Sequence, residues 1–156
     1  MTERETTRLI AWSRELRQVH VRLREALDLT RSAVTEGVSA EAFTRELLLY
    51  CHGFCAALDG HHRSEDHLLF PAIKAAHPEL EPVLRKLSQD HSMIAHLLGG
   101  LRATIDRAAP VVELDRHLDG VAAIMESHFR YEERELLGVL ETLSLDASPE
   151  EALGPL

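Results

Sequence analysis

The sequence predicts an all-α protein, an antiparallel up-down-up-down four-helix bundle, and three observations support this fold class. The chain of 156 residues has the length of one domain with a single core. Apolar residues recur at spacings of three and four in every long segment, and no stretch alternates as a strand would. Glycines and prolines mark short connections between the segments, which favours antiparallel neighbours. We therefore expect the bundle over residues 1–143 and a flexible tail over residues 144–156.

The first two predicted helices are joined by a short turn. The first extends from about Glu3 to Val34, and Gly37 marks the turn that follows it. Ser39 is a candidate N-cap for the second helix. We expect this second helix to end near Pro71, because proline lacks the N–H group that would continue it.

The third and fourth predicted helices are separated by another connection that contains proline. The third helix lies between Pro82 and Pro110. The fourth has an apolar stripe that runs from Leu114 to Val139. These two helices complete the predicted bundle.

The charge and composition of the chain argue against several classes of function. Seventeen Lys and Arg residues stand against 26 Asp and Glu, which gives a formal net charge of -9. Such an acidic chain, with no basic run, is poorly suited to nucleic acid or to an anionic membrane. The sequence begins without an apolar leader segment and has no apolar stretch long enough to span a bilayer, so we expect a cytoplasmic protein. Cys51 and Cys55 lack the spacing of a metal or redox motif and are expected to be buried, reduced thiols.

Histidine is in excess, with ten residues in the chain. Six polar residues occupy the inward stripes, where a plain bundle would have apolar side chains. They are His20, His61, Glu65, His91, His128 and Glu132. Burying such groups without partners is expensive, so they must satisfy one another, a water network or a metal.

These six residues follow an order that occurs twice along the chain. A single histidine precedes a His-x-x-x-Glu motif by 41 residues in the first half (20 to 61) and by 37 in the second (91 to 128). Positions i and i+4 share one helix face, so each motif directs an imidazole and a carboxylate toward one point. Four imidazoles and two carboxylates suit a pair of first-row metal ions with the carboxylates bridging. The histidine-rich set favours iron over manganese, while zinc and a metal-free core network remain as alternatives.

The levels of these residues along the helices agree for three of the four predicted helices, but the first connection fits poorly. Fourteen residues separate His20 from Val34, whereas twenty-one separate Ala40 from His61. Seven residues of helix correspond to ~10 Å. We therefore expect the first helix to run further, or the second to slide or bend.

Three segments of the sequence resemble the hemerythrin-like, or HHE cation-binding, family. They are His61-His62-Arg63-Ser64-Glu65-Asp66-His67-Leu68-Leu69-Phe70-Pro71, Asp90-His91 and His128-Phe129-Arg130-Tyr131-Glu132-Glu133. The resemblance covers roughly residues 10 to 143. It implies a four-helix bundle around two iron ions with an oxo or hydroxo bridge. It also implies that His20 and His61 cap one iron, that His91 and His128 cap the other, and that Glu65 and Glu132 bridge them.

One position departs from the family's oxygen carriers. Their third helix supplies a second histidine four residues after the first, and here that place is Ala95. On this ligand set each iron keeps an open position, whereas an oxygen carrier needs one saturated iron and one open iron. We therefore expect reaction with a peroxide or small diatomic ligand, catalase-like toward hydrogen peroxide or peroxidase-like toward nitric oxide. Oxygen or nitric oxide binding, redox sensing and iron storage without turnover are the alternatives, and so is a structural bundle with adventitious metal.

The remaining candidates lie around this site. Tyr50 is a candidate catalytic residue, either a ligand or a proton donor. Eleven residues of straight helix correspond to ~16 Å between Tyr50 and His61, which favours a position in the core or around the ligands rather than contact with the metal. Several carboxylates next to the ligands in sequence either orient the imidazoles or point to solvent. They are Asp66, Asp90, Glu126 and Glu133. Five histidines fall off the stripes and are expected to be solvated, namely His62, His67, His77, His96 and His117.

Overall fold

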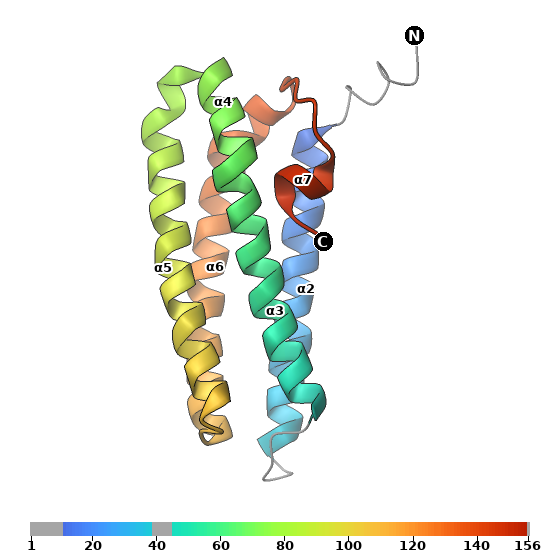
Figure 1. Ribbon diagram of the computed structural model, residues 1–156, viewed down its shortest axis with the longest axis vertical. Helices are drawn as coiled ribbons and strands as arrows, with labels where there is room; N and C mark the ends of the chain where they lie inside the picture. Colours follow the sequence, from blue (N-terminus) through green and yellow to red (C-terminus); the bar gives the residue numbers. More distant parts are fainter. Residues whose placement is uncertain (1–10, 39–44, 156) are drawn as a thin grey trace.

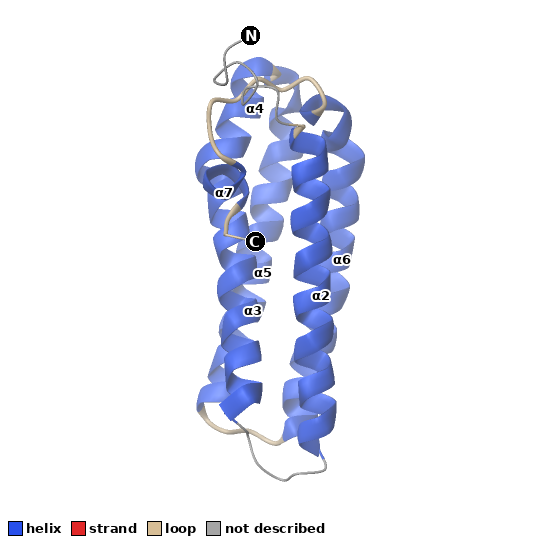
Figure 2. Cartoon of the chain, turned by 90° about the vertical axis from the view of Figure 1, so that its right-hand side faces the viewer, coloured by secondary structure: helices blue, strands red, loops and turns tan. Residues whose placement is uncertain are grey.

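The computed structural model of the protein describes residues 11–38 and 45–155, and within these residues it is helical with no strand (Figure 2). The all-helical prediction is confirmed. The long helices are α2 (Trp12–Val38), α3 (Arg45–Ser64), α5 (Glu81–Asp106) and α6 (Val111–Leu140). The shorter elements are the π-helical turn η1 (Glu65–Leu69), α4 (Phe70–Ala76), the 3₁₀ turn η2 (Pro78–Leu80) and α7 (Pro149–Leu153). None of the described helices is both long enough and apolar enough to cross a membrane.

The long helices pack side by side around one core (Figure 1). Helix α2 contacts α3 and α6, and α5 contacts the same two helices from the other side. The apolar stripes predicted from the sequence face inward, where leucines such as Leu16, Leu87 and Leu118 are fully buried. Each such leucine stabilises the fold by about 1.5–3 kcal/mol, and this apolar interior offsets the cost of the polar groups buried among it.

The connection between α2 and α3 removes the mismatch in helix levels. Helix α2 runs on to Val38, and α3 is described from Arg45. Eighteen residues then separate His20 from the end of α2, and sixteen separate the start of α3 from His61. The two imidazole rings accordingly lie at the same level, with their centroids 5.4 Å apart.

The prediction that the second helix ends near Pro71 is wrong, because a π-helical turn carries the helix past the proline. The N–H of Phe70 donates to the carbonyl oxygen of Glu65, five residues earlier. Pro71 then falls in the first turn of α4, where a missing N–H costs least, and the chain stays helical to Ala76. Turns of this kind often occur at functional sites, and this one begins at a predicted ligand.

Part of the segment that the sequence predicts to be a flexible tail is helical. Residues 149–153 form α7, which packs against α3, η1 and α2 (Figure 1). Ser148 and Glu151 form a capping box, in which each side chain bonds the other's backbone N–H. Ala152 and Leu153 are buried against the long helices, which supplies the apolar contact that holds this short helix in place.

Candidate metal centre

The fold brings all six predicted ligands together in the interior. His20 comes from α2, His61 from α3, Glu65 from η1 and His91 from α5, while α6 supplies His128 and Glu132. Each of the six is at most 5% exposed. A site assembled from every long helix is therefore held by the same packing that holds the fold.

The two carboxylates lie between the two halves of the ligand set, which are the histidine pairs His20–His61 and His91–His128. Glu65 Oε1 is 3.2 Å from His61 Nε2 and 3.4 Å from His91 Nε2. Glu132 Oε1 is 3.1 Å from His20 Nε2. Its other oxygen, Oε2, is 3.7 Å from His128 Nε2. Each carboxylate thus reaches one histidine of each half, which is the arrangement that bridging requires.

Most donor atoms of this cluster have no hydrogen-bond partner among the described residues. The four carboxylate oxygens are unpaired in this sense, because their short contacts to imidazole nitrogens lack hydrogen-bond geometry. Both nitrogens of His20 and Nε2 of His61 are unpaired too. Buried polar atoms left unpaired cost about 1–3 kcal/mol each, so this cluster is explained only by something that binds it. A cation is the natural occupant of a site lined by carboxylate oxygens and imidazole nitrogens.

Carboxylates outside the cluster orient the histidines of one half. His91 Nδ1 lies 2.9 Å from an Asp66 oxygen, and His128 Nδ1 lies 3.1 Å from an Asp90 oxygen. Each imidazole donates its Nδ1–H to the carboxylate, which leaves the Nε2 lone pair facing the centre. Of the two roles open to Asp66 and Asp90 from the sequence, the structure supports orientation of the imidazoles.

A backbone carbonyl orients a histidine of the other half. His61 Nδ1 donates to the carbonyl oxygen of Leu153 in α7, at 2.7 Å. The chain passes so close here that a Cβ on Gly154 would lie 3.0 Å from the His61 backbone, and Gly154 has a φ of 92°, which favours glycine. Sequence reasoning missed this contact, although the Ser-x-x-Glu capping pattern at Ser148 is a signal for the short helix.

The outer nitrogen of His20, Nδ1, has a more distant partner than those of the other three histidines. Its Nδ1 lies 3.5 Å from an oxygen of Glu133, and that carboxylate also contacts Arg24 at 3.3 Å. The His20 ring stacks on Phe129, with the ring centroids 3.8 Å apart. Glu133 therefore belongs to the surroundings of the cluster, while Glu126 contacts Arg24 and Arg130 instead.

Burial and neighbouring charges separate the pKa values in the cluster. Burial and the negative charge of Glu132 raise the pKa of Glu65 well above its usual value. Burial also acts to raise the pKa of Glu132, but His20 outweighs it and the pKa is lowered. Burial and the charge of His20 lower the pKa of His61 to about 3. His61 is consequently neutral at physiological pH, which is the form of imidazole that binds metal.

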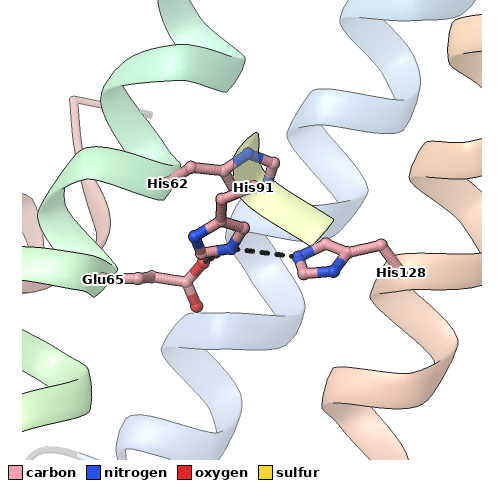
Figure 3. A group of neighbouring side chains, drawn as sticks. All are labelled: His62, Glu65, His91 and His128. Carbon is pink, nitrogen blue, oxygen red and sulfur yellow. Dashed lines mark hydrogen bonds and ion pairs between the residues drawn. The ribbon is translucent and has the colours of Figure 1, made fainter. Parts of the chain in front are cut away.

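His62 is a seventh member of the cluster, and the prediction that it is solvated is wrong. Its side chain is 4% exposed, and its Nε2 has no hydrogen-bond partner in the part of the chain that the structure describes. Figure 3 shows it converging with Glu65, His91 and His128, and donor atoms of these four residues lie within 4.8 Å of one another. Helix α3 packs against both α2 and α5, so it buries a wider arc than one stripe. His61 and His62, about 100° apart, both fall within that arc.

The other candidates lie outside the cluster. The Tyr50 side chain is 44% exposed, so the expectation of a core position is wrong. Ala95 is exposed and adds no donor. Of the histidines expected to be solvated, His67 and His96 are exposed, and His77 and His117 are half-buried. Cys51 and Cys55 are free and buried as predicted, and burial raises their pKa values to about 12 and about 11, which keeps the thiols protonated.

The fold and this cluster define a helical protein with a buried histidine-carboxylate metal site. The family model of the hemerythrin HHE cation-binding domain matches residues 13–140. The chain therefore belongs to the hemerythrin HHE family, as its motifs predict. No curated protein and no solved structure matches the chain.

Proposed function

We propose that this protein is a non-haem di-iron protein that reacts with hydrogen peroxide or nitric oxide. One observation carries the proposal: two neighbouring groups of buried donors, His20–His61–Glu132 and His62–Glu65–His91–His128, converge in the interior. Within the described residues, the carboxylate oxygens of both groups and Nε2 of His20, His61 and His62 have no hydrogen-bond partner. Two adjacent groups with carboxylates that reach both are suited to a pair of ions. The helix contacts further support an antiparallel up-down-up-down four-helix bundle around that pair.

Iron is the metal that we propose, as two ions joined by an oxo or hydroxo bridge. A set of imidazoles with few carboxylates suits iron better than manganese, which favours oxygen ligands. A closed structural zinc site usually contains thiolates. The thiols of Cys51 and Cys55 stand outside both donor groups and are held protonated by burial.

The protein residues would hold the ions, set their surroundings and control access. Bound iron would supply redox chemistry toward peroxide or nitric oxide. The Nδ1–H donors of His61, His91 and His128 fix each ring so that its other nitrogen faces the centre. Phe129 is fully buried and stacks on the His20 ring, which helps to exclude bulk water from the centre.

Reversible binding of oxygen or nitric oxide, with a role in sensing or storage, is the second candidate function. The observation that favours it is His62, which brings a third histidine to the His91–His128 side despite the alanine at position 95. One saturated and one open iron is the arrangement that a carrier needs. The peroxide and nitric oxide reactions require only one open position, so His62 favours the second candidate without excluding the first.

Activity assays on the iron-loaded protein separate the two functions. We expect oxygen evolution from hydrogen peroxide, or consumption of nitric oxide, over many turnovers per chain. A Glu65→Gln variant should lose this activity, while Glu79→Gln, at an exposed residue, should keep it. An iron-loaded protein that binds nitric oxide or oxygen reversibly but turns over neither substrate would support the second function. A protein with neither behaviour would contradict both.

A further inference from the structure

We propose that His62 is a metal ligand on the His91–His128 side, so that the two metal positions of this protein are unequal. The inference rests on the proposed metal centre and adds to it a residue that the repeated motif does not contain. It also specifies which side of the centre keeps an open position.

The environment of His62 is that of a ligand. The side chain is 4% exposed, and its Nε2 is buried without a hydrogen-bond partner among the described residues. An imidazole that served only to fill space would be better replaced by an apolar side chain, because the unpaired nitrogen weakens the packing. The nitrogen is explained if its lone pair faces a cation.

The position of His62 is set by two other histidines of the same group. Its ring lies nearly parallel to that of His91, with centroids 3.9 Å apart and an interplanar angle of 13°. It meets the ring of His128 edge-on, with centroids 5.0 Å apart. The three rings and the Glu65 carboxylate belong to α3, η1, α5 and α6, and Figure 3 shows that they converge. Donor atoms of these four residues lie within 4.8 Å of one another. These four residues are therefore close enough together to hold one ion.

The count of donors differs between the two sides. The carboxylates of Glu65 and Glu132 each reach both sides, so they do not distinguish them. The remaining donors are His20 and His61 on one side, and three histidines on the other. They are His62, His91 and His128. The second side is thus closer to octahedral saturation, and a small ligand would bind on the side of His20 and His61.

Substitution by phenylalanine separates a ligand from a packing residue. His62→Phe keeps a planar ring against His91 and removes the nitrogen. His67→Phe is the matched control, because His67 lies five residues further along the same continuous helix and is exposed. We would load each protein with ⁵⁷Fe, record Mössbauer spectra and follow the release of iron to a chelator.

The wild-type protein and His67→Phe should show two unequal iron environments. His62→Phe should lose one of its two irons to the chelator at least tenfold faster, and its two environments should become more alike. Spectra and release rates that are the same in all three proteins would overturn the inference. If His62→Phe does not fold, His62→Ala serves instead, and added imidazole should slow its iron release toward the wild-type rate. No effect of imidazole on iron release from His62→Ala would count against ligation.

The proposed function and this inference fail in different ways. A wild-type protein that holds two ions of another metal contradicts the iron proposal, and the effect of His62→Phe on release of that metal still tests the inference. A wild-type protein that binds no metal overturns both. A protein that holds two irons, with His62→Phe unchanged, overturns the inference alone.

Discussion

The two halves of the metal centre have the same motif and different surroundings. Each half contributes a histidine and a His-x-x-x-Glu segment. In the half that contains His20 and His61, the outer nitrogens face a backbone carbonyl of α7 and the more distant Glu133. In the half that contains His91 and His128, they face two carboxylates, Asp66 and Asp90, at 2.9 and 3.1 Å.

This difference teaches that the repeated motif sets which residues are ligands, but not how strongly each of them donates to a metal ion. A carboxylate that accepts the Nδ1–H of an imidazole makes the other nitrogen a stronger donor than a carbonyl does. The His91–His128 half therefore combines better donors with the additional histidine, His62. We expect that half to hold its ion more tightly, and the following predictions test the comparison in order of decreasing effect.

The largest effect is expected from a carboxylate that both halves share. Glu132→Gln removes the charge that contacts His20 and His128, so both ions should be lost, with metal affinity reduced by about 100-fold or more. Metal analysis after gel filtration measures the loss, with Glu141→Gln at an exposed residue as control. Retention of both ions would show that the carboxylate is not shared.

A smaller effect is expected from the carboxylates that support one half. Asp90→Asn should weaken metal binding on the His128 side by about 10–100-fold and leave the other ion in place. Chelator release should therefore show one accelerated phase and one unchanged phase. Asp106→Asn, at an exposed residue of the same helix, is the control. Equal acceleration of both phases would contradict the separation of the halves.

The contact between α7 and His61 should affect both the stability of the fold and metal binding on the His20–His61 side. Gly154→Ala places a Cβ 3.0 Å from the His61 backbone at a φ of 92°, so we expect a loss of about 1–3 kcal/mol in the free energy of unfolding. The ion on the His20–His61 side should become the more labile one. Gly138→Ala is the matched control, because a Cβ there meets nothing within 4 Å and should raise helix stability by about 0.5–1 kcal/mol. Thermal unfolding of both variants gives the comparison, and equal stability would exclude a close fit of α7.

The smallest effect is expected at Glu133, since it lies 3.5 Å from His20 Nδ1 and also contacts Arg24. Glu133→Gln should accelerate iron release from the first half by less than tenfold. Glu126→Gln disturbs Arg24 without contacting His20, so it separates the two contributions. An effect of Glu133→Gln as large as that of Asp90→Asn would contradict the weaker support of His20.

The sequence predicted the helical fold and the residues that meet at the centre, because both depend on local periodicity. An inward stripe at spacings of three and four fixes which face of each helix is buried, and His61 and Glu65 share that face. Counting residues gave matching levels for the ligands on most neighbouring helices. The mismatch at His20 arose because the first helix ends later than predicted, and helix ends are poorly defined by sequence.

The features that the sequence did not predict depend on contacts between distant segments. His62 is buried because α3 has neighbours on two sides, which a single stripe does not express. The helix passes Pro71 because a π-helical turn precedes it. Leu153 reaches His61 across 92 residues of sequence. Helical periodicity carries no information about such a contact.

The central claim, a dinuclear metal centre in the interior, is tested most directly by metal analysis of the purified protein from iron-replete cells. The proposed di-iron centre predicts about two irons per folded chain. The same measurement on Glu132→Gln should give little or none. A folded wild-type protein without metal, as heat-resistant as the same protein after incubation with iron, would contradict the account.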